Sequence, residues 1–293
     1  MGMNFRNRHL VETYNPKPLI ALARNKIATK HRLEAEAIPV PKTIAEVHFH
    51  QHLRVTYPRL IGHNGGFVVK PACSSRGNGV LVCNGAEPDR IVRHDGSTMR
   101  RADFEFYINQ ILYGEFSYGL PVDAALFEQR IHPRQSWIYE ELPGAPDLRV
   151  IVHTGRAIMA MARIPTLVSC GRANLHRGGL GVGIDLERGR TTYGVQFGRP
   201  VERHPDTGVE LGGREVPDFA LCVELAERSY RALALGYMGV DLMYDATLGP
   251  VVIELNARPG LAVQTANRAG LRTRSKPSYV KSLASPVGVP APC

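Results

Sequence analysis

The stretch GVDLMYDATLGPVVIELNARPG, residues 239–260, combines apolar, strand-like runs with three oxygen-bearing side chains. Asp241 interrupts the first run, and Glu254 and Asn256 end the second. Strands that pack in a protein interior usually carry valine, isoleucine or leucine at such positions. The presence of two carboxylates and an amide in these runs therefore needs an explanation, and that explanation bears on both the fold and the chemistry.

The two runs predict a β-hairpin. If the four residues 246–249 form its turn, Asp245 faces Pro250, and Asp241 then lies directly across from Glu254. Side chains alternate along a strand, so the residue two positions after Glu254 projects from the same face. The hairpin would thus gather its three polar side chains on one face.

Two like charges opposite each other in a ladder repel, and burying them unpaired is costly. A divalent cation removes that conflict. The all-oxygen set of Asp241, Glu254 and Asn256 suits Mg²⁺, with Mn²⁺ as a substitute. The alternative is an exposed hairpin with solvated acids, followed by an ordinary turn.

Length and composition describe a globular chain of 293 residues, 44% of them hydrophobic, which can bury a sizeable core in one or two domains. No apolar run approaches the roughly 20 residues that span a bilayer, and no signal-peptide core is visible, so a cytoplasmic location is predicted. The five cysteines lack metal-binding spacing. The net charge of +9 comes mostly from scattered arginines. This charge suits anionic ligands, with nucleic acid as a secondary alternative.

Hairpins alternate with helices along the chain, and this pattern predicts an α+β fold. Residues 17–37 look helical, and residues 217–236 show the clearest helical stripe, with Asp218 at its start and Gly236 at its end. The residues after 275 are rich in Pro and small side chains and are predicted to form a loose tail.

A second candidate site is VVKPACSSRGNGV, where the strand residue Lys70 precedes a glycine-rich loop. The groups of this loop that could bind phosphate are the hydroxyls and backbone N–H groups of Ser74, Ser75, Gly77 and Gly79. An ordinary hairpin turn is about as good an explanation. Lys26 and Lys30 lie one helical turn apart and share a face, as solvated surface lysines also do.

Taken in order along the chain, these segments resemble the ATP-grasp superfamily. The resemblance is to carboxylate–amine ligases such as the glutamate ligases, and within them to the α-L-glutamate-ligase-related, sugar-transfer-associated branch. The matching motifs are NKIATKHRLEAEAIPVPKT, FVVKPACSSRGNGV, LFEQRI, DLRVIV, RANLHRGG, HPDTG and VVIELNARPGLAVQTANRAGL. Two features depart from the pattern: few residues precede Lys26, and the segment 132–146 is longer than in the glutamate ligases.

The resemblance implies two α+β lobes, built from antiparallel sheets and helices, that clasp ATP, with the N-terminal pre-grasp domain absent or vestigial. The predicted parts are an N-terminal helical segment (1–55), a small lobe with the glycine-rich lid loop (56–131), a large lobe with the metal and substrate site (132–275) and a tail (276–293).

The resemblance also implies roles for individual residues. Lys70 and Lys26 would contact the α- and β-phosphates, under a lid formed by residues 74–79. Asp147 would contact the ribose. The backbone of the hinge Glu128, Gln129, Arg130 and Ile131 would hold adenine.

The remaining roles lie on the reaction side. Arg149, Arg172 and Asn174 would stabilise the reacting phosphoryl group, and Asp241, Glu254 and Asn256 would bind two Mg²⁺ ions. The proposed substrate contacts are Arg163, His176, Gly178, Gly179 and Arg258.

Simpler explanations exist for several of these side chains. Arg149 and Arg163 alternate with apolar residues and could form the exposed face of a hairpin. His176 could be a hydrogen-bonded turn residue. His48 and His52 have i, i+4 spacing, but a solvated face fits better than zinc because no third ligand is apparent. Cys73 has no recognisable His partner for nucleophilic catalysis.

The predicted activity is an ADP-forming, ATP-dependent ligation of a carboxylate to an amine through an acyl phosphate. The expected substrates are small molecules, an amino acid (glutamate-like) or a peptide, and a homo-oligomer is left open. The alternatives are an ATP/Mg-binding module that does not ligate and, less favoured, a basic nucleic-acid-binding protein.

Overall fold

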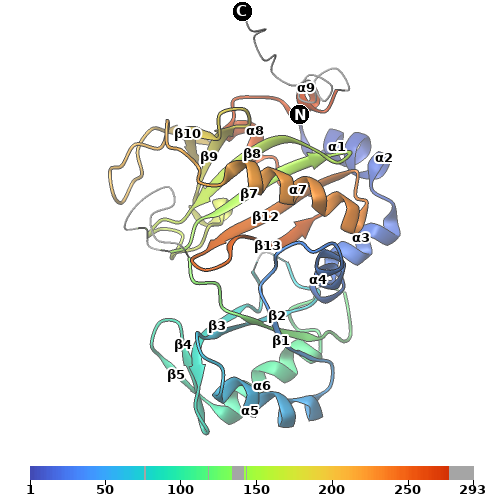
Figure 1. Ribbon diagram of the computed structural model, residues 1–293, viewed down its shortest axis with the longest axis vertical. Helices are drawn as coiled ribbons and strands as arrows, with labels where there is room; N and C mark the ends of the chain where they lie inside the picture. The colour runs from blue at the N-terminus through green and yellow to red at the C-terminus, as the bar shows by residue number, and fades with distance from the viewer. Residues whose placement is uncertain (76, 118, 134–141, 143, 277–293) are drawn as a thin grey trace, which may run out of the picture. The chain divides into compact units, whose positions relative to one another are not determined.

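The computed structural model describes residues 1–75, 77–117, 119–133, 142 and 144–276 (Figure 1). The chain forms two compact units. Unit 2 is Ile20–His132, and unit 1 combines Met1–Leu19 with the chain from Pro133 onward. Most of the segment 132–146, Arg76 in the predicted lid, and the predicted tail from 277 lie outside the described residues.

Unit 2 is a six-stranded antiparallel sheet with two helices on one face (Figure 1). Its strand order is β1-β6-β2-β3-β4-β5. The strands are β1 (Thr43–Val47), β2 (Phe67–Pro71), β3 (Leu81–Ala86), β4 (Arg90–Arg93), β5 (Thr98–Arg100) and β6 (Ala125–Gln129). The helices are α4 (Lys26–Ala35), the short η2 (His50–His52), α5 (Leu53–Ile61) and α6 (Arg101–Leu112), and α3 (Lys17–Arg24) crosses the unit boundary.

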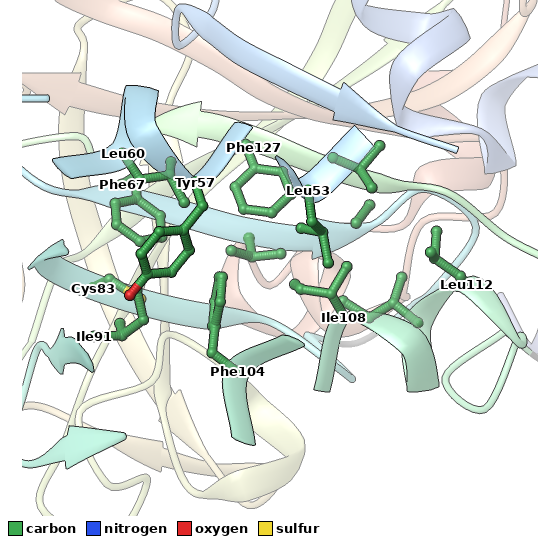
Figure 2. Packing of buried hydrophobic residues seen from close by; sticks show 14 residues of the cluster. Leu53, Tyr57, Leu60, Phe67, Cys83, Ile91, Phe104, Ile108, Leu112 and Phe127 are labelled. Atoms are coloured by element: carbon green, nitrogen blue, oxygen red, sulfur yellow. The ribbon is translucent and has the colours of Figure 1, made fainter. Parts of the chain in front are cut away.

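The core of unit 2 lies between the sheet and the helices α5 and α6 (Figure 2). Tyr57 from α5 and Phe104 from α6 meet Phe67 and Phe127 from the central strands, all fully buried. Alternation along β2 sends Phe67 and Val69 into this core and leaves Lys70 on the opposite face. The core thereby fixes the direction of the predicted phosphate-binding lysine.

Unit 1 is a seven-stranded antiparallel sheet of order β11-β10-β9-β8-β7-β12-β13. Its strands are β7 (Asp147–His153), β8 (Arg156–Ile164), β9 (Leu180–Asp185), β10 (Arg190–Gln196), β11 (Arg199–Val201), β12 (Tyr237–Asp245) and β13 (Gly249–Asn256). Its helical segments are α1 (Met3–Arg6), η1 (Asn7–Val11), α2 (Glu12–Tyr14), η3 (Leu175–Arg177), α7 (Phe219–Leu233), α8 (Ala262–Ala266) and α9 (Leu271–Arg274).

The long helix α7 crosses one face of the seven-stranded sheet (Figure 1). Tyr244 of β12 points to that face, where its hydroxyl lies 3.0 Å from Cys222 Sγ of α7. Because side chains alternate, Asp241 projects from the other face. We call this other face, which carries Arg149, Arg163 and Asp241, the site face.

Two antiparallel sheets with flanking helices confirm the predicted α+β class. The predicted helix over 17–37 is instead two helices, because Asn25 adopts an extended backbone and caps α4 by accepting a hydrogen bond from the Ala28 N–H at 3.0 Å. The helix α7 ends before Gly236, since Ala234 takes the left-handed conformation (φ 52°).

The N-terminal segment differs from the predicted single unit of residues 1–55. Its first part, through Leu19, belongs to unit 1, and β1 is an edge strand of the unit 2 sheet. The other division, at His132, falls close to the predicted boundary. In the part of the chain that the structure describes, no helix has the length and apolarity needed to cross a membrane.

Candidate active site

The candidate residues of unit 2 centre on a carboxylate between two lysines. Glu128 of β6 is 4% exposed, and its Oε1 accepts a hydrogen bond from Lys30 Nζ of α4 at 2.8 Å. Its Oε2 lies 2.5 Å from Lys70 Nζ of β2. The Lys70 side chain keeps 17% of its surface exposed, whereas that of Lys30 keeps 5%. Lys70 is therefore the cation of this cluster that remains open to a ligand.

Charge and burial compete in this cluster. Burial alone raises the pKa of Glu128, but the ammonium groups of Lys70 and Lys30 outweigh burial and hold the pKa below its usual value. Burial also lowers the pKa of Lys30, partly offset by Glu128. Two cations against one anion leave excess positive charge on this face of the unit 2 sheet.

The glycine-rich loop after β2 is held at its start by polar contacts. Lys26 Nζ donates to the carbonyl of Ser74, and the Cys73 N–H donates to Asp123 at 3.0 Å. Ser74 is buried and Ser75 is exposed. Lys26 thus anchors the loop in this structure, and Asp123 is a loop anchor that no sequence pattern indicated.

The two predicted loop glycines have different surroundings. Both have positive φ, 71° at Gly77 and 68° at Gly79. A Cβ on Gly79 would come within 2.7 Å of Pro71 Cγ and 2.6 Å of Phe116 Cγ, whereas one on Gly77 would meet nothing within 4 Å. Gly79 is required by packing, and Gly77 lies at the open part of the loop.

Two backbone N–H groups of the predicted adenine hinge already donate hydrogen bonds to other residues of unit 2. The Gln129 N–H donates to the Lys42 carbonyl at 2.8 Å, and the Arg130 N–H donates to the Gly66 carbonyl at 3.2 Å. A base that bound this segment would have to use other backbone groups of Glu128, Arg130 or Ile131. The side chains of this segment are also engaged, since Arg130 Nη1 donates to Asn84 Oδ1.

The candidate residues of unit 1 form a buried charge cluster across three strands. Asp241 of β12 is 2% exposed and accepts from Arg149 of β7 through both oxygens, at 2.7 and 2.6 Å. Arg163 of β8 donates to Asp241 Oδ2 at 2.8 Å and forms a two-point ion pair with Asp147. Asn256 Nδ2 also donates to Asp241, at 3.1 Å.

Strand register creates this cluster. Asp241 lies opposite Arg149 in β7 and opposite Glu254 in β13, and Asp147 lies opposite Arg163. Two arginines therefore sit against two acids on the site face. Arg149 and Arg163 are only 13% and 14% exposed. The simpler explanation, an exposed hairpin face, is wrong for both.

Arg149 and Arg163 neutralise the buried acids of this cluster, so a metal ion is not needed to pair Asp241. Burial raises the pKa of Asp241, but Arg149 and Arg163 outweigh it and hold the pKa below its usual value. Burial, with a smaller contribution from the Asp241 charge, raises the pKa of Asp147 to about 6 against the opposing effect of Arg163. Burial would lower the pKa of Arg163, but the two carboxylates raise it overall. The premise that Asp241 is buried unpaired was wrong.

The β12–β13 hairpin has the predicted Asp241–Glu254 pairing, but its turn and register differ from the prediction. Asp245 faces Gly249 and not Pro250, so the turn is one residue shorter than predicted. A bulge then shifts the register between Leu242 and Asp241 and restores the pairing of Asp241 with Glu254.

The oxygen donors fit a hard divalent cation in part. Glu254 is half-buried opposite Asp241, and Asn256 adjoins both, so a carboxylate and an amide lie side by side. Asp241 could join them only by giving up contacts to its arginines. Within the described ranges no cluster of three or more His, Cys, Asp or Glu side chains has metal-binding geometry.

The RANLHRGG segment forms a tight turn before β9. Asn174 Oδ1 accepts from the His176 N–H at 3.0 Å and caps η3. Gly178 has φ 99°, and a Cβ there would lie 2.8 Å from Val168, while a Cβ on Gly179 would lie 3.1 Å from the Asn174 backbone. The close approach at these glycines is made by the protein itself. The exposed residues of the turn are Arg172, His176 and Arg177.

Two weaker candidates have ordinary explanations. His48 and His52 are not one turn apart on an α-helix, because His52 ends the short η2 and His48 precedes it. Burial, with a contribution from Asp123, raises the pKa of the Cys73 thiol to about 11, so the nucleophilic thiolate is disfavoured near neutral pH.

Comparison with known proteins gives one family and several solved structures to which this chain is similar. The family model described as sugar-transfer associated ATP-grasp matches residues 5–278. No curated protein matches the sequence. The crystal structure of the D-cycloserine synthetase DcsG is similar over 92% of this chain and 72% of that one, with 14% identity and a TM-score of 0.50.

Two further solved structures have lower TM-scores. The ATP-grasp ligase PsnB, complexed with a minimal precursor, shares 15% identity with a TM-score of 0.45, and the match covers 92% of this chain and 63% of that one. An L-amino acid ligase from Bacillus licheniformis shares 13% identity over 85% of this chain and 43% of that one, with a TM-score of 0.44. The chain thus spans less than two thirds of the length of PsnB.

Proposed function

The chain belongs to the sugar-transfer-associated ATP-grasp family, and from this premise we propose that it is an ATP-dependent carboxylate–amine ligase. The observation that carries the proposal is the row of side chains across three adjacent strands of the site face: Arg149 pairs with the buried Asp241, Glu254 lies opposite Asp241, and Asn256 donates to Asp241. A surface hairpin has no need of such a row. A ligase needs fixed cations beside oxygen donors, since phosphoryl transfer depends on positioning and charge neutralisation.

The proposed reaction has two steps. A substrate carboxylate oxygen attacks the γ-phosphorus of ATP, the bond from that phosphorus to the β,γ-bridging oxygen breaks, and ADP leaves. An amine then attacks the carbonyl carbon of the acyl phosphate, inorganic phosphate leaves, and the amine proton passes to solvent or a neighbouring base. The first step is required because a carboxylate is a poor electrophile until phosphate becomes its leaving group.

Unit 2 would supply the nucleotide contacts. Lys70, the partly exposed cation beside Glu128, would neutralise phosphate charge, and Lys26 would hold the loop that carries the remaining donors. These donors are the N–H and hydroxyl groups of Ser74, Ser75, Gly77 and Gly79. Glu128 would keep Lys70 oriented, which is a positioning role that the sequence did not assign to its side chain.

Unit 1 would supply the reacting end. Arg149 is fixed by Asp241, so its guanidinium is preorganised and needs little rearrangement to face a phosphoryl group. Arg172 and His176 are exposed on the capped turn and would contact substrate, whereas Asn174 would act by shaping that turn. Arg163 and Asp147 are paired with each other, so we assign them the support of Asp241 before any contact with substrate or ribose.

Magnesium would be held by Glu254 and Asn256, with Asp241 as a third ligand only if it releases an arginine. When bound, Mg²⁺ neutralises charge on the β- and γ-phosphates. Two ions, with Mn²⁺ as a substitute, are the number expected for this family. The substrates that the arginine-rich site favours are acids, with an amino acid (glutamate-like) or a peptide as the proposed class.

One observation favours a second candidate, an ATP-binding module that does not ligate. The full engagement of Asp241 by two arginines opposes its use as a metal ligand. Such a module would bind ATP but release no ADP with any acid and amine.

The test is incubation with ATP, Mg²⁺ and a panel of acids and amines, with ADP release and product mass as readouts. An ¹⁸O-labelled carboxylate should deliver label to inorganic phosphate. Label absent from phosphate, with AMP among the products, would mean adenylation and would contradict the proposed chemistry. ATP binding without turnover on any pair would favour the non-ligating module.

A further inference from the structure

The turn Ala257–Pro259, which directly follows Asn256, is held by side chains from the other end of the chain. Asn15, at the end of α2, is 2% exposed. Its Nδ2 donates to the carbonyls of Tyr237 at 2.7 Å and Ala257 at 3.0 Å, and its Oδ1 accepts from the Tyr237 N–H at 2.9 Å. One amide thus joins the start of β12 to the residue after the end of β13.

Asn15 takes the place of a missing strand partner. In the ladder between β12 and β13, Gly239 faces Asn256, so continued pairing would put Arg258 opposite Tyr237. The chain instead leaves the sheet after Asn256, and the Asn15 amide satisfies the N–H and carbonyl of Tyr237 that Arg258 would have used. This substitution allows β13 to end directly after a proposed metal ligand without leaving buried backbone groups unpaired.

Arg6 holds the other side of the same turn. Arg6 is 6% exposed, and its Nη1 donates to the Pro259 carbonyl at 2.6 Å and to the Arg258 carbonyl at 3.4 Å. Asn7 Oδ1 accepts from Arg6 Nη2 at 2.6 Å and from Arg6 Nε at 3.1 Å. In the described part of the chain no carboxylate pairs with Arg6. Its partners are carbonyl and amide oxygens, the kind of contact that fixes backbone shape.

The turn that these two residues hold lies over the site face. Pro259 packs on Gly239, where a Cβ would come within 2.8 Å of Pro259 Cβ. Gly239 is on the same side of β12 as Asp241, two residues away. Arg258 is exposed between Ala257 and Pro259, which are both buried. Arg6 and Asn15 are separated by a π-helical stretch, Asn7–Val11, a feature often found near functional sites.

We propose that Arg6 and Asn15 are positioning residues of the substrate site, which together fix the Ala257–Pro259 turn so that Asn256 and Arg258 face the reacting groups. The assignment of Arg258 to a substrate carboxylate rests on the proposed function. The immobilisation of the turn does not, because it follows from the contacts of unit 1 alone.

The experiment compares Arg6→Met and Asn15→Leu with the control Arg8→Met, which removes an exposed arginine from the same segment. Hydrogen exchange is followed in the full-length protein for residues 255–261 and for the β12 residues 240–244. Loss of either clamp should speed exchange in 255–261 by about tenfold or more while β12 stays within about twofold, since the opening is local. Arg8→Met should leave both segments unchanged.

Kinetics provide the second readout. The KM for the carboxylate substrate should rise about tenfold in Arg6→Met and Asn15→Leu. The KM for ATP should rise less, because the carboxylate would contact Arg258 of the loosened turn directly, whereas ATP would depend on the turn only through a metal ion at Asn256. Arg6→Lys retains a charged donor for the Pro259 carbonyl and should recover part of both effects.

Three results would overturn the proposal: exchange in 255–261 equal to that of Arg8→Met, equal acceleration throughout the seven-stranded sheet, or matching increases in both KM values. A wild-type protein that turns over no acid and amine would defeat the proposed ligase function. The exchange measurement would still decide whether Arg6 and Asn15 hold the turn.

Discussion

The charged cluster of unit 2 and the charged cluster of unit 1 balance their charges differently. In unit 2, Lys30 and Lys70 surround the single carboxylate Glu128, and one lysine stays partly exposed. In unit 1, two arginines meet two carboxylates, and all four side chains are largely buried. The first cluster has positive charge left over for an anion. In the second cluster the charges of the two arginines and the two carboxylates cancel. Arg149 and Arg163 are therefore held in place, and a metal cation would have to compete with them for Asp241 and Asp147.

This difference distinguishes the roles of Lys70 and Arg149, which the motifs alone did not distinguish. Lys70 and Arg149 were both assigned to phosphate on the basis of resemblance. In the proposed function Lys70 would attract the nucleotide, whereas Arg149 is held in place by Asp241. Removing a member of the neutral cluster should therefore affect folding first, and removing Lys70 should affect binding first.

The largest effect is expected from Asp241→Ala. The substitution leaves Arg149 and Arg163 buried with one carboxylate between them, and breaking a buried ion pair in this way typically destabilises by about 3–5 kcal/mol. Urea unfolding of the variant against wild type measures the loss. A change below about 1 kcal/mol would mean that the cluster is solvated in solution and would remove the contrast with unit 2.

Glu254→Ala should separate chemistry from stability. Glu254 lies opposite Asp241 but is only half-buried, so the unfolding free energy should fall far less than in Asp241→Ala. If Glu254 holds Mg²⁺, ligase turnover should drop by at least about 10²-fold, or roughly 2.7 kcal/mol. Wild-type turnover of this variant at saturating Mg²⁺ would contradict the metal assignment.

Much of the fold followed from local sequence pattern. The strands around Lys70 and Asp241, and the helix α7, are encoded by alternation or helical periodicity over short windows. The Asp241–Glu254 pairing was predicted correctly although the turn was not, because a shorter turn and a bulge cancel. Bulges leave no clear signal in a single sequence, so this agreement was partly fortuitous.

The charge partners could not be predicted in the same way. Arg149 and Asp241 are 92 residues apart, and their meeting depends on β7 pairing with β12, a choice that neither strand encodes locally. Asn15 and Tyr237 are separated by 222 residues. Side chains that act by holding distant backbone, such as Arg6 and Asn15, carry no motif, because any donor of suitable length could fill the role.

Lys70→Ala tests the open cluster. We expect ATP binding to weaken by about 1.5–3 kcal/mol, the range of a hydrogen bond to a charged group. Isothermal titration calorimetry measures the change, and Lys42→Ala, which removes an exposed lysine of unit 2, is the matched control. Equal affinities in the two variants would remove Lys70 from the nucleotide site.

The smallest expected effect is the response of folding stability to acidification. The contributions of Glu128 in unit 2 and Asp147 in unit 1 should change in opposite directions as the pH falls. The pKa of Glu128 is lowered from 4.5 on folding because Lys70 and Lys30 outweigh burial. Its ionised form therefore stabilises the fold above pH 4.5, and this contribution is lost as the pH falls through the folded pKa. The pKa of Asp147 is raised from 3.8 to about 6, chiefly by burial. The folded state then binds a proton more readily, so the Asp147 contribution should improve as the pH falls from 6 toward 4.

Urea unfolding between pH 3 and pH 7, for wild type, Glu128→Gln and Asp147→Asn, isolates each contribution as wild type minus variant. On acidification we expect the Glu128 difference to become less favourable below pH 4.5 and the Asp147 difference to become more favourable between pH 6 and 4. Equal signs would mean that Arg163 outweighs burial at Asp147 as the lysines do at Glu128. The contrast in sign between Glu128 and Asp147 would then be lost.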